Sequence, residues 1–167
     1  MLPRWSCTPP PFATPPPGFT VREVVHYDPG LIPFLNELDL LTYAEPTFSR
    51  FSLGAFLRHG RVYIARVDDV LVGSCHCLRD FSQPDEVVIF NMALRPGWRG
   101  NGMGRHFLER VLDMLRAHGI RAVSLQVAEN NLPAQRLYKD KFGFQEVEVH
   151  CDEYCNGQDY RQMRLLL

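Results

Sequence analysis

The sequence has no long apolar run and almost no net charge. No stretch approaches the ~18 consecutive apolar residues that suggest a transmembrane helix, so we expect no membrane partner. The 18 Lys and Arg residues nearly balance the 19 Asp and Glu residues, for a net charge of −1. Because phosphate backbones attract basic surfaces, this balance argues against nucleic acid as the main partner.

The five cysteines form no regular metal-binding pattern. On a strand, Cys75 and Cys77 face one side and His76 the other, so the three cannot share a metal ion. Cys151 and Cys155 lack the two-pair spacing of a zinc site. An odd number of cysteines, without the apolar core of a secretory signal, favours reduced thiols. We therefore expect no metal and a cytoplasmic location.

The composition fits one domain with a proline-rich extension. With 167 residues, of which 46% are hydrophobic, the chain can form one substantial core. Residues 1–18 hold seven of the 13 prolines, which exclude a helix and favour extended conformations. We expect a flexible tail over residues 1–18 and a folded domain over residues 19–167.

A strand, a turn and a helix form the centre of the predicted fold. Residues 87–94 are apolar on both alternating faces, as in a strand that is covered on both sides. Pro96 and Gly97 end this strand, and from Met103 to Leu115 the apolar residues recur at helical spacing. The other predicted strands are 19–25, 61–67, 71–78, 122–127, 145–152 and 161–167, and the other helices are 31–41, 47–58 and 132–142.

The central turn has the composition of a phosphate-binding loop. It contains Gly100, Gly102, Gly104, Arg99 and Arg105. The first turn of a helix leaves backbone N–H groups without partners, and glycines let an anion approach them closely. We therefore expect a phosphate or a diphosphate here. The alternative is a glycine-rich turn that only connects the strand to the helix.

Two other phosphate-binding loops do not fit. A Walker loop requires a Lys and then a Ser or Thr after its last glycine, and Arg105 and His106 stand there instead. The dinucleotide fingerprint requires the spacing Gly-x-Gly-x-x-Gly, whereas the glycines here follow Gly-x-Gly-x-Gly.

Two segments resemble signatures of the GNAT family of acetyl-CoA-dependent N-acyltransferases. The first covers residues 92–104, with Arg99, Gly102 and Gly104 at the family's Arg/Gln-x-x-Gly-x-Gly/Ala positions. The second consists of Asn131, Ala134, Leu137, Tyr138, Gly143 and Phe144. Their order and their separation make the pair far more specific than either segment alone.

The resemblance covers roughly residues 19–167 and implies an α/β fold. This is a central mixed sheet, flanked by about four helices, whose two parallel strands splay apart to admit the pantetheine arm of acetyl-CoA. A bulge near Asn91 or Met92 would direct one N–H at the thioester oxygen. The implied acetyl-CoA contacts are Met92, Ala93, Leu94, Arg99, Gly100, Asn101, Gly102, Met103, Gly104, Arg105, Asn131 and Ala134. Asn131 is also a candidate helix cap.

The resemblance also assigns the acid. Tyr138 occupies the position of a tyrosine that protonates the departing CoA thiolate, and a phenol of pKa near 10 is protonated when needed. For the base, Glu86 is the best local carboxylate, with Glu45, His76 or a water chain as alternatives. Several family members carry an acidic residue where this chain has Asn91.

These residues predict an N-acetyltransferase that joins acetyl-CoA and a primary amine of a small molecule or peptide in a ternary complex. The connection between the first two helices makes Tyr43 and Glu45 candidate substrate contacts, and the segment 153–160 is another acceptor loop. Asn91 of the central strand is a third candidate, which would orient the amine or a water. The rival hypothesis is a non-catalytic acyl-CoA sensor or interaction module. A nucleic-acid-binding basic turn is a third, and a homodimer is left open.

Overall fold

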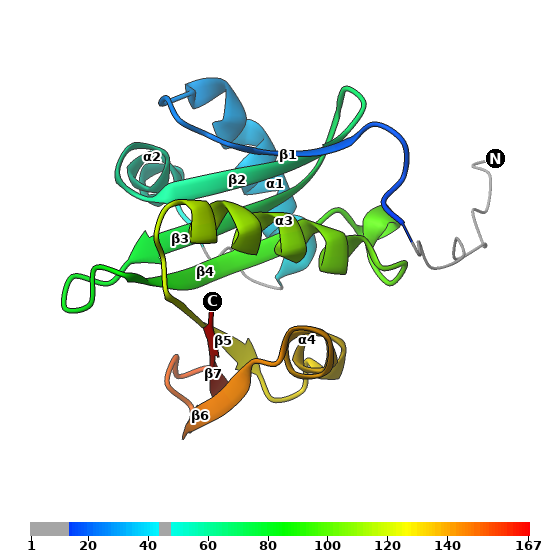
Figure 1. Ribbon diagram of the computed structural model, residues 1–167. Helices are drawn as coiled ribbons and strands as arrows, with labels where there is room; N and C mark the ends of the chain where they lie inside the picture. The colour runs from blue at the N-terminus through cyan, green and yellow to red at the C-terminus, as the bar shows by residue number, and fades with distance from the viewer. Residues whose placement is uncertain (1–13, 44–47) are drawn as a thin grey trace.

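The computed structural model describes residues 14–43 and 48–167. Its centre is a seven-stranded sheet of order β1-β2-β3-β4-β5-β7-β6 (Figure 1). The strands are β1 (Phe19–Glu23), β2 (Arg61–Val67), β3 (Val70–Arg79), β4 (Glu86–Leu94), β5 (Ala122–Ala128), β6 (Gln145–His150) and β7 (Tyr160–Leu166). Only β4 and β5 pair in parallel; every other neighbouring pair is antiparallel. The predicted mixed sheet is therefore confirmed.

Four α-helices accompany the sheet in the described part of the chain. They are α1 (Ile32–Thr42), α2 (Arg50–His59), α3 (Met103–Ala117) and α4 (Leu132–Arg136). Two short 3-10 turns, η1 (Pro29–Leu31) and η2 (Pro96–Trp98), precede α1 and α3, and a π-helical turn, η3 (Leu137–Lys141), continues α4. The predicted order of strands and helices is confirmed. Glu45, a candidate substrate contact and alternative base, and residues 1–13 of the predicted tail lie outside the described residues.

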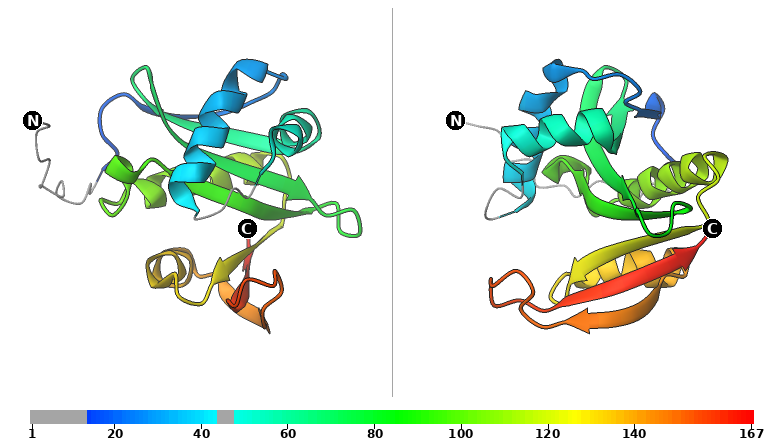
Figure 2. Two further views of the ribbon diagram at one scale, coloured as in Figure 1. Left: turned by 180° about the vertical axis from the view of Figure 1, so that it is seen from behind. Right: turned by 90° about the vertical axis from the view of Figure 1, so that its left-hand side faces the viewer.

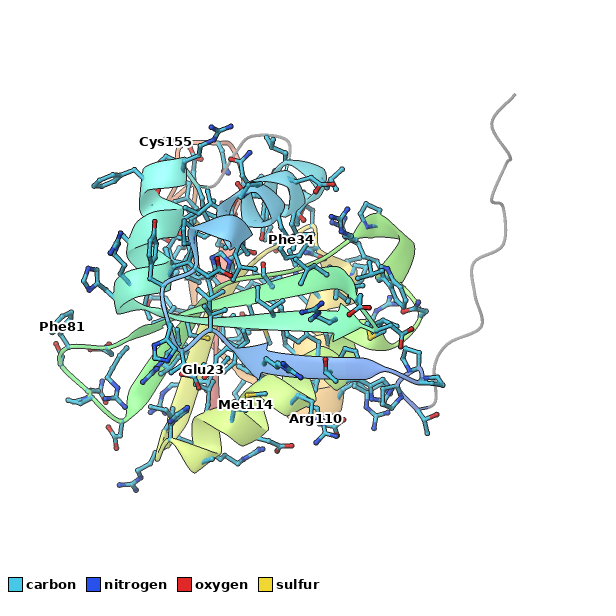
Figure 3. All side chains as sticks on the ribbon, turned by 90° about the horizontal axis from the view of Figure 1, so that it is seen from above. Glu23, Phe34, Phe81, Arg110, Met114 and Cys155 are labelled. Carbon is cyan, nitrogen blue, oxygen red and sulfur yellow. The ribbon has the colours of Figure 1, made fainter. Side chains whose placement is uncertain are left out.

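Two apolar cores lie on opposite faces of the sheet. α1 and α2 pack on one face of β2, β3 and β4, around Leu35, Leu38 and Phe56. α3 lies on the other face, where Phe107, Leu108 and the neighbouring residues of its apolar stripe are fully buried. Figure 3 shows Phe34 of α1 and Met114 of α3 on opposite sides of the strands. The helical spacing in the sequence thus directs each helix to its face.

The C-terminal half of the sheet is covered on one face only. α4 and η3 pack with α3 on the core side of β5, through Ala134 and Tyr138. On the opposite face, the described parts of α1 and α2 extend over β2–β4 and leave β5, β7 and β6 open (Figure 2). No helix in the described part of the chain has both the length and the apolar character to cross a membrane.

Candidate active site

β4 and β5 separate halfway along their length. They pair over Glu86–Ile89 and Ala122–Leu125, and the pairing then stops. At the same level a bulge in β4 leaves Phe90 without a partner on β3. The splay and the bulge next to Asn91 confirm the sequence-based predictions. Among the described residues, the backbone of β4 beyond Phe90 has no strand partner on the β5 side, so this edge can bind an extended ligand.

The glycine turn leaves amide groups available beside the end of β4. Gly100 and Gly102 have φ angles of 76° and 90°, a left-handed backbone that glycine adopts without strain. Within the described part of the chain, the amides of Gly102 and Gly104 have no hydrogen-bond acceptor. α3 begins at Met103, so the positive end of its dipole points at these amides. The turn has the geometry of an anion site.

Two predicted cofactor residues are used inside the protein. Asn101 is 1% exposed, and its Oδ1 accepts a 3.2 Å hydrogen bond from the amide of Met103, the first residue of α3. The guanidinium of Arg99 donates to the Leu94 carbonyl at 2.6 Å and to Thr42 Oγ1 at 2.9 Å. Arg99 therefore fixes the end of α1 to the end of β4.

Arg105 is a second exposed cation of the turn. It lines an open cavity of about 490 Å³ along α3, together with Lys141 at the end of η3. Asn131 caps α4, because its Oδ1 accepts a hydrogen bond of 3.3 Å from the amide of Ala134. The predicted capping role of Asn131 is thus confirmed.

Tyr138 lies on the π-helical turn, where the regular helix is interrupted. Its ring packs on Phe144 with the centroids 5.7 Å apart. Burial raises the pKa of the Tyr138 phenol, and the nearby Cys75 thiol and Tyr43 hydroxyl raise it further. No described residue hydrogen-bonds to the Tyr138 hydroxyl, so its proton is available to a ligand. π-Helical turns often occur at functional sites, but the sequence motif alone does not reveal this one.

Tyr43, which follows α1, lies near Tyr138 and contacts Asn91 of β4. The Tyr43 hydroxyl donates a 2.9 Å hydrogen bond to Asn91 Oδ1. Burial raises the pKa of Tyr43 to about 12, with smaller contributions from Asp39 and from Tyr160 of β7. Both phenols are therefore neutral at physiological pH.

Glu86, the predicted base, stands at the opposite end of β4 from the splay. Its carboxylate accepts hydrogen bonds from both Nε, at 3.3 Å, and Nη2 of Arg164. The positive charge of Arg164 balances the negative charge of Glu86, and the ion pair links β4 to β7. Its assignment as the base stays a prediction.

His76 lies on the α1 and α2 side of β3, whereas Cys75 and Cys77 lie in the α3 core. Its ring is within 5.5 Å of the rings of Phe48 and Phe56, and burial lowers its pKa to about 4. A buried imidazole with so low a pKa is a weak proton acceptor.

No sequence pattern assigns a role to Gln126 on β5. Its Nε2 donates a 2.8 Å hydrogen bond to Glu153 Oε2, and its Oε1 accepts one from the hydroxyl of Tyr154. Both partners belong to the loop between β6 and β7. Only the fold brings them to Gln126, because they lie 27 and 28 positions further along the chain.

The sequence of the folded part matches a known family. Residues 31–144 match the profile of the acetyltransferase (GNAT) family. The [ribosomal protein bS18]-alanine N-acetyltransferase of Haemophilus ducreyi is 33% identical over 70 residues, which are 42% of this chain and 48% of that protein. The chain thus spans about half the length of the curated relatives it matches.

The fold is also similar to solved structures. The crystal structure of the ribosomal-protein-S18-alanine N-acetyltransferase from Escherichia coli superimposes with a TM-score of 0.76, at 20% identity, over 89% of this chain and 93% of that one. A Bacillus subtilis acetyltransferase in complex with CoA gives 0.72, at 20% identity, over 89% and 99%. These similarities support the fold, and the profile match covers most of the sequence. The chain therefore belongs to the acetyltransferase (GNAT) family.

Proposed function

We propose that the protein is an N-acetyltransferase that joins acetyl-CoA and the α-amine of a peptide or protein in a ternary complex. The observation that carries this proposal is the gap between β4 and β5, which has an unpaired strand edge. Tyr138 lies near Tyr43, and its hydroxyl has no hydrogen-bond partner among the described residues. The same gap lies directly beside the glycine turn. Acetyl-CoA carries both a thioester, which fits the gap, and a diphosphate, which fits the glycine turn.

The residues present fit acetyl-CoA. The amides of Gly102 and Gly104, with the dipole of α3, would hold the diphosphate, and Arg105 adds positive charge beside them. The backbone of Met92, Ala93 and Leu94 would pair with the two amides of the pantetheine arm, which replaces the missing strand contact. The remaining members of the proposed contact set are Arg99, Gly100, Asn101, Met103, Asn131 and Ala134.

The protein then has two tasks in the reaction. The backbone at the bulge would donate a hydrogen bond to the thioester oxygen as the carbonyl carbon becomes tetrahedral. Tyr138 would give its proton to the sulfur as the carbon–sulfur bond breaks. Since the pKa of Tyr138 is raised by burial, the phenol keeps its proton until the thiolate forms. The attacking nitrogen would be positioned by Tyr43 and Asn91 on the opposite wall.

The neutral side chains of Tyr43, Asn91 and Tyr138 favour a weakly basic amine. An α-amine with a pKa of about 8 is roughly one-tenth neutral at pH 7, whereas a lysine amine with a pKa of about 10.4 is only ~0.04% neutral. The difference is worth about 3 kcal/mol before attack begins. Tyr43, Asn91 and Tyr138 provide no charge that would remove this penalty. The bS18-alanine N-acetyltransferases among the relatives also support an α-amine acceptor.

The test uses a short peptide with a free N-terminal alanine and one internal lysine, and the same peptide with a formylated amino terminus. We expect acetyl-CoA to raise the melting temperature, and CoA thiol to be released only with the free peptide. Fragmentation mass spectrometry should place the acetyl group on the α-nitrogen. Acetylation of the lysine in both peptides would contradict the proposal that the acceptor is an α-amine. Stabilisation without thiol release on any amine would favour a non-catalytic acyl-CoA sensor.

The absence of a nucleic-acid partner, the cytoplasmic location and the possible homodimer stay predictions. A gel-filtration measurement with light scattering tests the last of these directly.

A further inference from the structure

We propose that the carboxylate of Glu153 accepts the proton that the acceptor nitrogen loses during acetyl transfer, and that Gln126 is the positioning residue that holds this carboxylate at the mouth of the gap. The inference rests on the proposed function and adds two residues to the same reaction. Both residues lie outside the two segments of the chain that resemble the family signatures.

Gln126 stands at the rim of the gap. The pairing of β4 with β5 ends at Leu125, so Gln126 is the first residue of β5 whose β4 side is open. Leu125 and Val127 are buried in the core under α3, so the alternation of the strand directs Gln126 to the opposite face. On β4, Ala93 belongs to the core under α1 and α2, and Asn91 lies two residues before it on the same face. Gln126 of β5 and Asn91 of β4 therefore lie on opposite sides of the gap, and both point to the sheet face that carries α1 and α2, where the acceptor is expected.

Gln126 fixes the position of Glu153. The amide group has one donor and one acceptor contact to consecutive residues, Glu153 and Tyr154. The carboxylate of Glu153 only accepts hydrogen bonds, so exchange of the amide oxygen and nitrogen would place two acceptor oxygens against each other and break this contact. Tyr154 also packs edge-on against Tyr160, with the ring centroids 4.8 Å apart.

The loop that carries Glu153 is itself held in shape. Asp152 Oδ1 accepts a 2.7 Å hydrogen bond from the amide of Gly157, and the amide of Asp152 donates to Asp159 Oδ1 at 3.1 Å. Asp152 has a φ angle of 45°. These contacts present Glu153 and Tyr154 toward β5, so the carboxylate occupies a defined place at the mouth.

Glu153 is also the carboxylate best suited to take a proton. Its side chain is 38% exposed, and His150 Nδ1 lies 4.0 Å from Oε2. Among the described residues, Glu153 Oε1 has no hydrogen-bond partner, so one oxygen remains available. Glu86 differs, because Arg164 binds both of its oxygens. Glu148, on the same open face, is 64% exposed and makes no hydrogen bond to β5 among the described residues.

The proton balance is simple. The neutral amine attacks the thioester carbon, a carbon–nitrogen bond forms, and the nitrogen becomes positively charged and strongly acidic. Glu153 takes one proton from this nitrogen, the carbon–sulfur bond breaks, and Tyr138 gives one proton to the sulfur. The protein returns to its starting state when Glu153 releases its proton to solvent and Tyr138 regains one. No other reactant is needed.

The first test compares two single variants in the peptide assay with the free N-terminal alanine. Glu153→Gln keeps the side-chain shape and an acceptor for the Gln126 amide but cannot take a proton. We expect kcat to fall about 10²-fold and KM for the peptide to stay within about 3-fold. The matched control is Glu148→Gln, which removes the same charge from the same face and should leave kcat within about 2-fold. Equal losses in both variants would overturn the assignment, because they would show that the total negative charge of this sheet face, and not the Glu153 carboxylate itself, affects kcat.

The second test moves the carboxylate. The double variant Gln126→Glu with Glu153→Gln places a carboxylate directly on the rim, and we expect it to regain at least about 10-fold in kcat over Glu153→Gln alone. A purely structural role predicts a further loss instead. If Glu86→Gln lost activity while Glu153→Gln kept it, Glu86 would be the base and this inference would be overturned. No turnover by the unmodified protein would overturn the proposed function itself, and the assignment with it.

Discussion

The hydroxyl of Tyr43, the first residue after α1, donates a 2.9 Å hydrogen bond to Oδ1 of Asn91, which lies beside the bulge of β4. The contact joins residues 48 positions apart and connects the acceptor wall to the strand that is expected to hold the thioester. Because Tyr43 is the donor, its oxygen retains lone pairs that can accept a hydrogen bond from the incoming amine. The pair thus links amine binding to the geometry of the bulge.

Removal of this hydroxyl is expected to affect the acceptor more than acetyl-CoA. In Tyr43→Phe, Asn91 Oδ1 loses its donor, and a hydrogen bond of this kind is worth about 0.5–1.5 kcal/mol. We expect kcat/KM for the peptide to fall roughly 2- to 12-fold, with the acetyl-CoA dissociation constant unchanged in calorimetry. Tyr27→Phe is a suitable control, because Tyr27 is an aromatic partner of Arg58 away from the gap. An equal loss in both variants would contradict a role at the acceptor wall.

Replacement of Tyr138 is expected to slow the chemical step. In Tyr138→Phe the ring still packs on Phe144, but no proton is available for the thiolate. We expect kcat to fall about 10²-fold, near the lower limit for general acids, because a thiol of pKa ~8.5 is already a good leaving group. The acetyl-CoA dissociation constant should stay within about 3-fold. A kcat within about 3-fold of that of the unmodified protein would mean that solvent protonates the sulfur.

The pH dependence gives a second check on Tyr138. Only the protonated phenol can act as an acid, and burial raises its pKa above the ordinary value of about 10. The active form therefore persists as the pH rises, so Tyr138 should cause no alkaline loss of kcat below about pH 10. A pH profile of kcat with the free peptide measures this. An alkaline limb near pH 8 that disappears in Tyr138→Phe would show that the phenol loses its proton much earlier.

Local sequence patterns were sufficient for the order of the elements and for the glycine turn, whereas the gap between the two parallel strands was predicted from the family resemblance. Strand 87–94 is apolar on both faces, and the turn that follows is rich in glycine, so the start of α3 and its free amides could be predicted from neighbouring residues alone. The backbone, and not distant side chains, makes these features. The same holds for the cap at Asn131, which depends on residues within one turn.

The directions of side chains that bridge distant segments could not be predicted. The charge of Arg99 predicted a contact with a phosphate, yet its guanidinium donates a hydrogen bond to Thr42, 57 positions away. The partners of Glu86 and Gln126 are likewise 78 and 27 positions distant. Periodicity and spacing carry no information on such contacts. The π-helical turn at Tyr138 is equally hidden, because its sequence reads as ordinary helix.

The left-handed backbone at Gly102 is expected to be essential for acetyl-CoA binding. An added Cβ at a φ angle of 90° strains the backbone by roughly 1–2 kcal/mol and shifts the amides at the start of α3. We expect Gly102→Ala to weaken acetyl-CoA about 10-fold in calorimetry. The control is Gly97→Ala in the same turn, where an added Cβ meets nothing within 4 Å. Equal affinities for the two variants would contradict the proposed anion site.

The buried imidazole of His76 is expected to make folding stability depend on pH. Burial lowers its pKa to about 4 in the folded state, against about 6.5 in the unfolded chain, so between these values the unfolded chain binds more protons. Stability from this group is complete above about pH 6.5 and declines as the pH falls toward 4. By pH 5 the loss should reach about 2 kcal/mol. Urea unfolding at pH 7.5 and pH 5 measures it.

The matched variants for His76 remove the titrating ring in two ways. His76→Phe and His76→Leu both place an apolar side chain among Phe48 and Phe56, and at least one should lose less stability between pH 7.5 and pH 5 than the unmodified protein. His59→Gln, at the exposed end of α2, should keep the full loss. If both His76 variants lost as much stability between pH 7.5 and pH 5 as the unmodified protein and His59→Gln, then other groups would cause the loss of stability at low pH. The imidazole would then be reached by water and stabilised as a cation in the folded state.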